Sequence, residues 1–236
     1  MSPAASAGRA EPRRLYGRRQ GRPLKRSRQD VLETLLPRLS VPKDATALNP
    51  ADLFGRAPRS LWLEIGFGNG EHLTALLRRH PDRHYIGAEP FINGMSAFLK
   101  SIADDADAQD RVRVVMDDAI PVALALPDSC LDGLYILNPD PWPKKRHHKR
   151  RIASRDNLDV FARILKPDGM LVMTTDVDDL AEWMATQASR HPAFEWRAES
   201  AADWKTPPAG WVETRYESKG REAGRVQTYL LFRRKP

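Results

Sequence analysis

The feature that most constrains the fold is a repeated alternation of short apolar runs with segments of helical periodicity. Each apolar run has the length of one buried strand, and each segment after it places apolar side chains on one face of a helix. The runs lie at 61–65, 85–88, 112–116, 131–137 and 170–174, and the helical segments at 71–79, 92–103, 121–126, 152–165 and 180–190. Five such units predict an α/β fold with a parallel sheet and helices on both faces. A run at 226–232 predicts a late strand after a long irregular stretch.

The chain has 236 residues, of which 41% are hydrophobic, enough for the core of one large domain. No apolar run approaches the roughly 18 residues of a membrane span, and charges occupy the first 30 residues, where a signal peptide needs an apolar centre. The single cysteine, Cys130, cannot form an internal disulfide and has no companion for a zinc ribbon. We therefore expect no membrane association and a cytoplasmic location.

Positive charge is concentrated at the N-terminus. Residues 1–30 hold nine Lys and Arg against two acids, whereas basic and acidic residues balance in the rest of the chain. Because this segment has few apolar residues to bury, it predicts a disordered basic arm at 1–30 before a single domain at 31–236. Nucleic-acid contact is the favoured role. A solvated tail and an Arg-rich transit peptide stay open as alternatives.

A glycine-rich loop joins the first predicted strand to its helix. Gly66, Gly68 and Gly70 stand at alternate positions, with Glu64 two residues before the first of them. Such a loop lets a ligand lie against main-chain N–H groups near a helix N-terminus. A dinucleotide-binding loop would place its third glycine where this chain has Glu71, which argues against NAD and FAD. The loop therefore predicts a site for a different nucleoside cofactor.

Carboxylates follow the second and third predicted strands. Glu89 stands 19 positions after Gly70, where it can accept hydrogen bonds from both ribose hydroxyls, although it could instead cap the next helix. Asp117 and Asp118 end the third strand, where one of them can accept from an adenine amino group. These acids complete the expected cofactor site.

The fourth predicted strand ends in the most specific stretch, residues 138–151. Two prolines flank Asp140 and restrict its backbone, so its side chain is presented beyond the strand end, where open α/β sheets bind ligands. Six Lys or Arg and two His follow directly, from Lys144 to Arg151. This cluster predicts phosphate contacts beside the reaction centre. Two adjacent histidines without a third ligand do not make a metal site, and we expect no metal.

Four stretches together resemble the TrmB family of tRNA (guanine-N7)-methyltransferases, which form 7-methylguanosine in the variable loop of tRNA. They are Glu-Ile-Gly-Phe-Gly-Asn-Gly at 64–70, Ile-Gly-Ala-Glu-Pro at 86–90, Pro-Asp-Pro-Trp at 139–142 with the basic run, and Thr-Arg-Tyr-Glu at 214–217 followed by Gly220. The resemblance implies a class I methyltransferase (Rossmann-like) fold, with a mostly parallel seven-stranded sheet and a late antiparallel strand. It implies S-adenosylmethionine (SAM) as cofactor, S-adenosylhomocysteine as product and tRNA as partner, and it leaves monomer and homodimer open.

The resemblance also implies residue roles. SAM contacts fall on Glu64, the three loop glycines, Glu89, Asp118 and Asp140, and the catalytic role falls on Asp140. Contacts with tRNA or the target base fall on Lys144, Arg146, His147, His148, Lys149, Arg150, Arg151, Asp176, Thr214, Arg215, Tyr216 and Glu217. Two positions, Asn138 and Pro143, depart from the residues frequent in the family.

The chemistry of guanine N7 is consistent with these residues. N7 carries a lone pair and no proton, so methyl transfer needs alignment rather than a general base. A carboxylate near the ring stabilises the charge that develops on the purine, and either Asp140 or Asp176 could accept from guanine N1–H and its exocyclic amine.

Two other functions stay open on the sequence alone. Asn-Pro-Asp-Pro-Trp at 138–142 is one residue away from the Asn-Pro-Pro-aromatic motif of amino-methyltransferases. A non-catalytic RNA-binding protein on the same fold is the other alternative. Nucleoside analysis separates the first from N7 transfer, and a melting shift with SAM separates the second.

Overall fold

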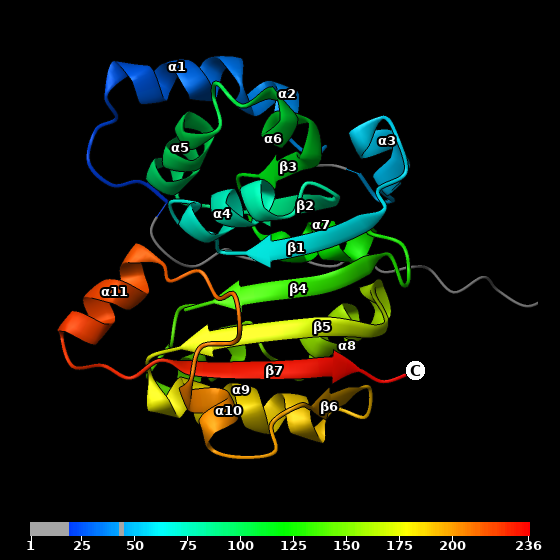
Figure 1. Cartoon of the computed structure of the whole chain (residues 1–236), viewed down its shortest axis with the longest axis vertical. Coiled ribbons are helices and arrows are strands. Elements are labelled where there is room, and N and C mark those ends of the chain that lie inside the picture. Colours follow the sequence, from blue (N-terminus) through cyan, green and yellow to red (C-terminus); the bar gives the residue numbers. More distant parts are fainter. Residues whose placement is uncertain (1–18, 43–44) are drawn as a thin grey trace, which may run out of the picture.

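The computed structural model describes residues 19–42 and 45–236 (Figure 1). The strands are β1 (Ser60–Ile65), β2 (Arg83–Ala88), β3 (Val112–Val115), β4 (Leu131–Leu137), β5 (Leu165–Thr175), β6 (Phe194–Trp196) and β7 (Thr228–Arg234). The helices are α1 (Arg26–Thr34), α2 (Leu36–Leu39), α3 (Pro50–Phe54), α4 (Glu71–Arg79), α5 (Ile92–Ser101), α6 (Ala106–Arg111), α7 (Ala119–Ala125), α8 (Arg155–Ile164), α9 (Asp178–Arg190), α10 (Ala202–Lys205) and α11 (Arg215–Glu222), with a 3₁₀ helix at Lys145–Arg150. Within these residues, no helix is both long and apolar enough to cross a membrane.

The described strands form one seven-stranded sheet in the order β3-β2-β1-β4-β5-β7-β6. Strands β1 to β5 pair in parallel, and β7 runs antiparallel to both β5 and β6. The prediction of a mostly parallel sheet with a late antiparallel strand is confirmed. The carboxyl ends of the parallel strands meet at one edge, beside which α11 lies (Figure 1). The strand order reverses between β1 and β4, the position where open α/β sheets bind their ligands.

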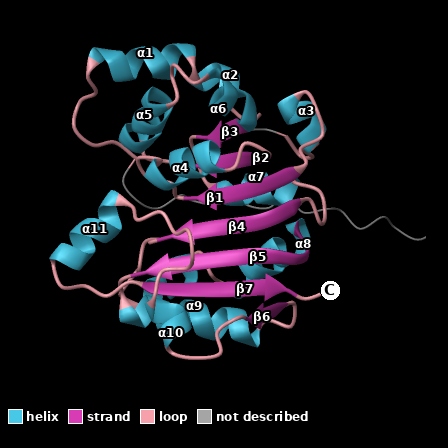
Figure 2. Ribbon diagram, viewed as in Figure 1, coloured by secondary structure: helices cyan, strands magenta, loops and turns pink. Residues whose placement is uncertain are grey.

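Helices cover both faces of the sheet (Figure 2). On one face, α4 and α5 bury Leu73 and Phe98 in a core that also takes side chains from α1, α2 and α6. On the other face, α7, α8 and α9 bury side chains such as Phe161 and Met184. The helical periodicity of the sequence therefore has the expected physical origin, because each crossover helix has one apolar face against the sheet.

The N-terminal boundary expected from composition is wrong for residues 19–30. Helix α1 begins at Arg26 and packs on α5. The segment before it is bonded to the start of α5: Ile92 N–H donates to the Arg19 carbonyl at 3.0 Å, and Asn93 accepts from Gly21 N–H at 2.7 Å. Charge alone suggested a free arm, but hydrogen bonds of the main chain hold this part in place. The rest of the predicted arm, residues 1–18, lies outside the described residues.

The stretch between α9 and β7, expected to be irregular, contains β6, α10 and α11. Two of these elements are only three and four residues long, too short to show a periodic pattern. Helix α11 is polar along most of its length and buries only Glu217 and Gly220. A helix without an apolar stripe gives no periodic signal.

Candidate functional site

The glycine loop lies between β1 and α4. Gly66, Gly68 and Gly70 have φ angles of 75°, 57° and 78°, in the left-handed region that other residues rarely adopt. A Cβ atom added to Gly66 or Gly68 would meet nothing within 4 Å, whereas one added to Gly70 would lie 2.4 Å from the Phe98 side chain. The first two glycines therefore leave open space beside the main chain, and the third permits close helix packing. This open cradle fits a nucleoside cofactor.

Glu89 supports the loop from the end of β2. Its side chain accepts from Gly68 N–H at 2.7 Å through one oxygen and from Phe91 N–H at 2.8 Å through the other. The residue is 7% exposed, and burial raises the pKa of its carboxyl group against the two backbone bonds. The negative charges of Asp140 and Glu64 raise this pKa further, which places three carboxylates in one electrostatic environment. Each oxygen keeps a second lone pair that can accept from a ribose hydroxyl. The ribose contact itself stays a prediction.

Glu64 is buried and paired within the protein. It is 1% exposed, and its Oε2 lies 2.9 Å from Nδ1 of His72, which is 2% exposed. The His72 ring contacts the rings of Tyr135 and Trp211 at centroid distances of 4.8 and 5.3 Å. The expected SAM contact of Glu64 stays a prediction, and the His72 pairing is a feature that no sequence motif indicated.

The two acids after β3 have different partners. Asp118 accepts from Ile120 N–H at 3.0 Å and caps α7, which brings the carboxylate to a fixed position at the strand end. Asp117 accepts from Asp118 N–H at 2.9 Å and lies 3.5 Å from the Arg19 guanidinium. The adenine contact expected for Asp118 stays a prediction. The N-terminal segment also reaches this edge, which composition did not indicate.

The loop after β4 is fixed at both sides of Asp140. Asn138 and Trp142 have positive φ angles of 48° and 43°. Asn138 N–H donates to the Thr174 carbonyl at 2.9 Å, and its side-chain oxygen accepts from Gln227 at 2.7 Å. An asparagine tolerates this left-handed backbone better than an aromatic or branched residue, which gives the departure from the family a local reason. Asp140 itself is exposed at the strand end, as expected.

Partial removal of water raises the pKa of the Asp140 carboxyl group, although the residue as a whole is exposed. The charge of Asp140 also acts on Glu89, across the edge from β4 to β2. A carboxylate in this position can stabilise positive charge on a ligand that lies between the two strand ends.

The basic segment after Asp140 is divided between exposed and packed side chains. Lys144, Lys145, Arg146 and Lys149 are exposed. Three side chains of the segment pack against two tryptophans. The His147 ring and the Arg150 guanidinium lie 5.9 and 5.0 Å from the centroid of the Trp142 ring, and the centroids of the His148 and Trp183 rings are 5.3 Å apart. Two aromatic side chains thus anchor a short helix whose lysines and Arg146 face solvent.

Arg151 does not belong to the exposed part of this segment. It is 1% exposed, its Nε donates to the Pro141 carbonyl at 2.9 Å, its guanidinium pairs with Asp179, and it lies 5.2 Å from the Trp183 ring centroid. The expected tRNA contact by Arg151 is therefore corrected. This arginine holds the Asp140 loop against α9, and a run of charges could not show that its last member is buried.

Helix α11 begins at the Thr214–Glu217 motif. Thr214 Oγ1 accepts from Glu217 N–H at 3.2 Å, and Glu217 Oε2 accepts from Thr214 N–H at 2.7 Å, a capping box. The Trp211 indole donates to the other Glu217 oxygen at 3.2 Å, and Glu217 is 5% exposed. Glu217 therefore stabilises the start of α11, and it also lines the pocket that Asp176 lines, so its expected contact with tRNA or the target base stays a prediction. Arg215 and Tyr216 are exposed on the same turn.

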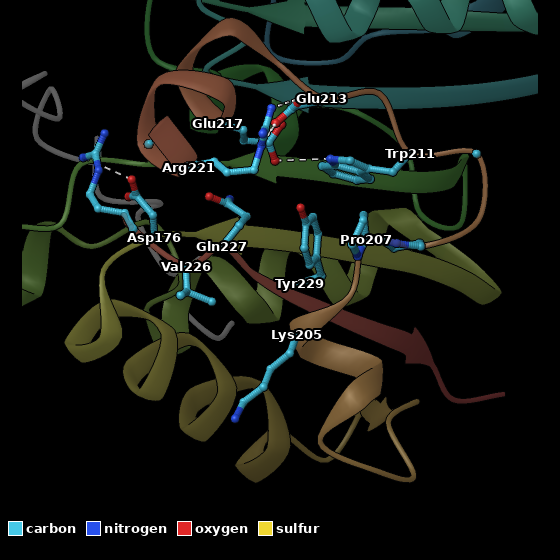
Figure 3. A pocket seen from close by; sticks show the side chains of 14 residues that line it. Asp176, Lys205, Pro207, Trp211, Glu213, Glu217, Arg221, Val226, Gln227 and Tyr229 are labelled. Carbon is cyan, nitrogen blue, oxygen red and sulfur yellow. Dashed lines mark hydrogen bonds and ion pairs between the residues drawn. The ribbon is translucent and has the colours of Figure 1, made fainter. Parts of the chain in front are cut away.

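Asp176 lies at the end of β5, and its side chain is 3% exposed. The Tyr216 hydroxyl donates to its Oδ1 at 3.2 Å, and the Arg225 guanidinium lies 3.1 Å from its Oδ2. Asp176 lines a pocket of about 650 Å³ between β5, β7 and the segment that leads into α11 (Figure 3). Trp211, Gln227 and Tyr229 also line it. A pocket of this size, with aromatic walls and a buried carboxylate, can hold a planar polar ring.

Three contacts join α4 to the start of α11 and to the segment before it. Arg215 N–H donates to Glu71 at 3.2 Å, Arg79 donates to the Gly210 carbonyl, and the rings of His72 and Trp211 are 5.3 Å apart. Sequence reasoning found neither Trp211 nor Arg225. Their contacts join positions far apart in the chain, and a single sequence carries no signal for them. In the described part of the chain, no group of three or more His, Cys, Asp or Glu side chains could hold a metal ion.

The amino-acid sequence of the chain is similar to those of known methyltransferases. A family model described as "Putative methyltransferase" matches residues 58–230. The tRNA (guanine-N(7)-)-methyltransferase of Rhodospirillum rubrum is 45% identical over 96% of this chain and 89% of the relative, and that of Rhizobium meliloti is 46% identical over 93% of this chain and 94% of the relative.

Solved structures show the same fold at low identity. The 16S rRNA methyltransferase KamB is 14% identical with a TM-score of 0.55, and it covers 84% of this chain and 99% of its own. The aminoglycoside resistance methyltransferase NpmB1 is 17% identical with a TM-score of 0.54, over 78% of this chain and 91% of its own. The fold is that of the class I methyltransferases, and the chain belongs to the family of the tRNA (guanine-N(7)-)-methyltransferases.

Proposed function

We propose that this protein transfers a methyl group from SAM to N7 of a guanine in the variable loop of tRNA. The observation that carries the proposal is one edge of the sheet, where the open glycine cradle, the exposed Asp140 and the Asp176 pocket lie at the ends of successive strands. Similarity to tRNA (guanine-N(7)-)-methyltransferases over nearly the whole chain supports the same substrate.

Residues on the β1 to β3 side would hold SAM. The main chain at Gly66 and Gly68 leaves room for the cofactor, Glu89 offers carboxylate lone pairs to the ribose, and Asp118 offers its remaining lone pairs to the adenine amine. Bound SAM supplies the activated methyl group. Attack by N7 on the methyl group needs alignment and no general base.

Asp140 and Asp176 take different roles in this proposal. Asp140 is exposed next to the cofactor acids, and its charge would stabilise the positive charge that develops on the purine. Asp176 is buried in a pocket with aromatic walls, and it would accept from guanine N1–H and the exocyclic amine. Such recognition orients N7 and rejects adenine, which cannot offer both donors.

The exposed cations after Asp140 would hold the tRNA backbone. Lys144, Arg146 and Lys149 reach solvent directly beyond the strand end, so phosphates bound there have a fixed position relative to Asp140. A cytoplasmic location, and a monomeric or homodimeric state, stay predictions.

The decisive experiment is incubation of the purified chain with labelled SAM and unmodified tRNA, followed by chemical cleavage at 7-methylguanosine and by nucleoside analysis. The proposal expects one cleavage site, in the variable loop, and label in 7-methylguanosine. Label in an N6-methyladenine or N4-methylcytosine nucleoside would show amino methylation instead. A chain that binds tRNA without any SAM-dependent melting shift would be a binding module.

A further inference from the structure

Asp176 is held from two directions by residues outside its own strand. The Tyr216 hydroxyl, on α11, donates to Oδ1 at 3.2 Å. The Arg225 guanidinium, from the connection between α11 and β7, lies 3.1 Å from Oδ2. Arg225 also lies 5.3 Å from the centroid of the Tyr216 ring. Because each partner also touches the other, the three side chains form a closed triangle at the wall of the pocket.

The main chain is shaped around this triangle. A Cβ atom on Gly220 would lie 3.2 Å from Asp176 Oδ2 and 3.4 Å from an Arg225 nitrogen, so a larger residue there would press on the ion pair. The chain then turns at Gly224, whose φ is 77°, and Arg225 N–H donates to the Gly220 carbonyl at 2.9 Å. The backbone thus returns Arg225 to the carboxylate at short range.

The ion pair leaves Asp176 with an unsatisfied oxygen. Oδ2 is buried beside the Arg225 guanidinium and, among the described residues, has no aligned hydrogen-bond donor. A carboxylate with 3% exposure and no cation beside it would be costly, so without Arg225 its orientation or charge would change. Arg225 is 44% exposed and reaches the pocket from the solvent side.

We propose that Arg225 is a positioning residue that fixes the Asp176 carboxylate in the orientation that reads the Watson–Crick edge of guanine. The inference rests on the proposed function, because it assigns a determinant of base selection in the Asp176 pocket. Guanine offers two donors to a carboxylate, N1–H and the exocyclic amine. A carboxylate that turns away can keep one of these bonds but not both, so loss of Arg225 reduces the advantage of the second donor.

The experiment uses two tRNA substrates that differ in that donor alone. One carries guanine at the target position and the other inosine, which lacks the exocyclic amine. For Arg225→Ala, the ratio of kcat/KM for guanine over inosine falls about tenfold, the loss of one charge-assisted hydrogen bond. Arg225→Lys keeps a cation and recovers part of the ratio. The matched control is Arg233→Ala, which breaks an ion pair between β7 and Glu195 of the neighbouring β6 and leaves the ratio unchanged.

Each other outcome overturns the inference. An equal loss on both substrates would mean that Arg225 only supports the fold of the pocket. A gain on both would mean that Arg225 competes with the base for Asp176. If Asp176→Asn leaves the guanine-to-inosine ratio unchanged while Arg225→Ala still lowers it, Arg225 does not act through Asp176. Failure of the underlying function looks different, because the unmodified chain then makes no 7-methylguanosine.

Discussion

The two halves of the site are built in different ways. On the side proposed for the cofactor, main-chain N–H groups donate to the Glu89 carboxylate and so hold it against the glycine loop, as Gly68 N–H does. On the substrate side, Asp176 is held by side chains from residues 216 and 225, and Asn138 by Gln227. The first half depends on local backbone shape and the second on contacts across the chain. Substitutions should therefore affect cofactor affinity on one side and alignment of the transferred group on the other.

The largest effect is expected from a substitution of Asp140, which lies between the two halves. We expect Asp140→Asn to lower the single-turnover rate of methyl transfer about a thousandfold at saturating SAM and tRNA, because it removes the charge that faces the developing cation. The melting temperature should stay near that of the unmodified chain, since Asp140 is exposed and has little packing to lose. The control is Asp178→Asn, another exposed acid beyond a strand of the same sheet. A rate close to normal in Asp140→Asn would remove Asp140 from the chemistry.

The second test concerns alignment by the basic segment. Replacing Lys144, Arg146 and Lys149 together by alanine should lower turnover about a hundredfold even at saturating tRNA, because a shift of about 1 Å in an aligned displacement has this cost. The matched control removes three exposed cations, Arg78, Lys100 and Arg190, from the last turns of α4, α5 and α9. Those turns lie at the opposite edge of the sheet, because crossover helices run antiparallel to their strands. Equal losses in both triple variants would mean that only total charge matters.

On the cofactor side, Glu89→Ala should lower SAM affinity by about 1.5–3 kcal/mol, roughly 10- to 150-fold, the range for hydrogen bonds to a charged group. Part of this loss comes through the loop, because Gly68 and Phe91 N–H lose their acceptor. Calorimetric titration with S-adenosylhomocysteine measures it. The turnover number at saturating SAM should change much less, and a variant with normal affinity but low turnover would contradict the division between the two halves.

How much of this site the sequence could predict follows the same division. The sequence predicts the positions of the loop glycines, Glu89 and Asp140, because these depend on residue type at a strand end, and α4 spans Glu71–Arg79 as periodicity predicts. The roles of these residues stay predictions. Arg151 and Glu217 carry a charge in a motif, but their burial depends on Trp183 and Trp211, which come from other elements. Arg225 lies eleven residues after Thr214 in a polar stretch, and only the turn at Gly224 brings it to Asp176. Such long-range pairs are invisible in one sequence.

The pH dependence of the reaction should reflect two acids whose carboxyl groups are desolvated, Asp140 and Glu89. Desolvation raises the pKa of both Asp140 and Glu89. Protonation removes the negative charge, so methyl transfer and SAM binding both fall as the pH drops, and the fall begins above the ordinary carboxyl range of about 4. Below the raised pKa the rate should drop about tenfold per pH unit for each group that must be ionised. The two groups are separated by measuring single-turnover rates and SAM affinities across the acid range, because ionisation of Glu89 changes only the SAM affinity. A rate that stays flat to about pH 4 would contradict the prediction.

The smallest expected effect concerns the N-terminal segment at the cofactor edge. Arg19 and Asp117 are 65% and 43% exposed and 3.5 Å apart, so their ion pair contributes at most about 1 kcal/mol, and Arg19→Ala should weaken SAM binding no more than about fivefold.

Asn93 holds the same segment by two hydrogen bonds, from Gly21 N–H at 2.7 Å and to the Arg22 carbonyl at 2.8 Å. Asn93→Ala should therefore have a larger effect than Arg19→Ala if the position of the segment, rather than its charge, matters at the cofactor edge. Raising the salt concentration separates the two contributions, because screening removes the ion pair but leaves the hydrogen bonds of Asn93 intact. If high salt weakens SAM binding as much as Asn93→Ala does, the segment acts at this edge through its charge alone.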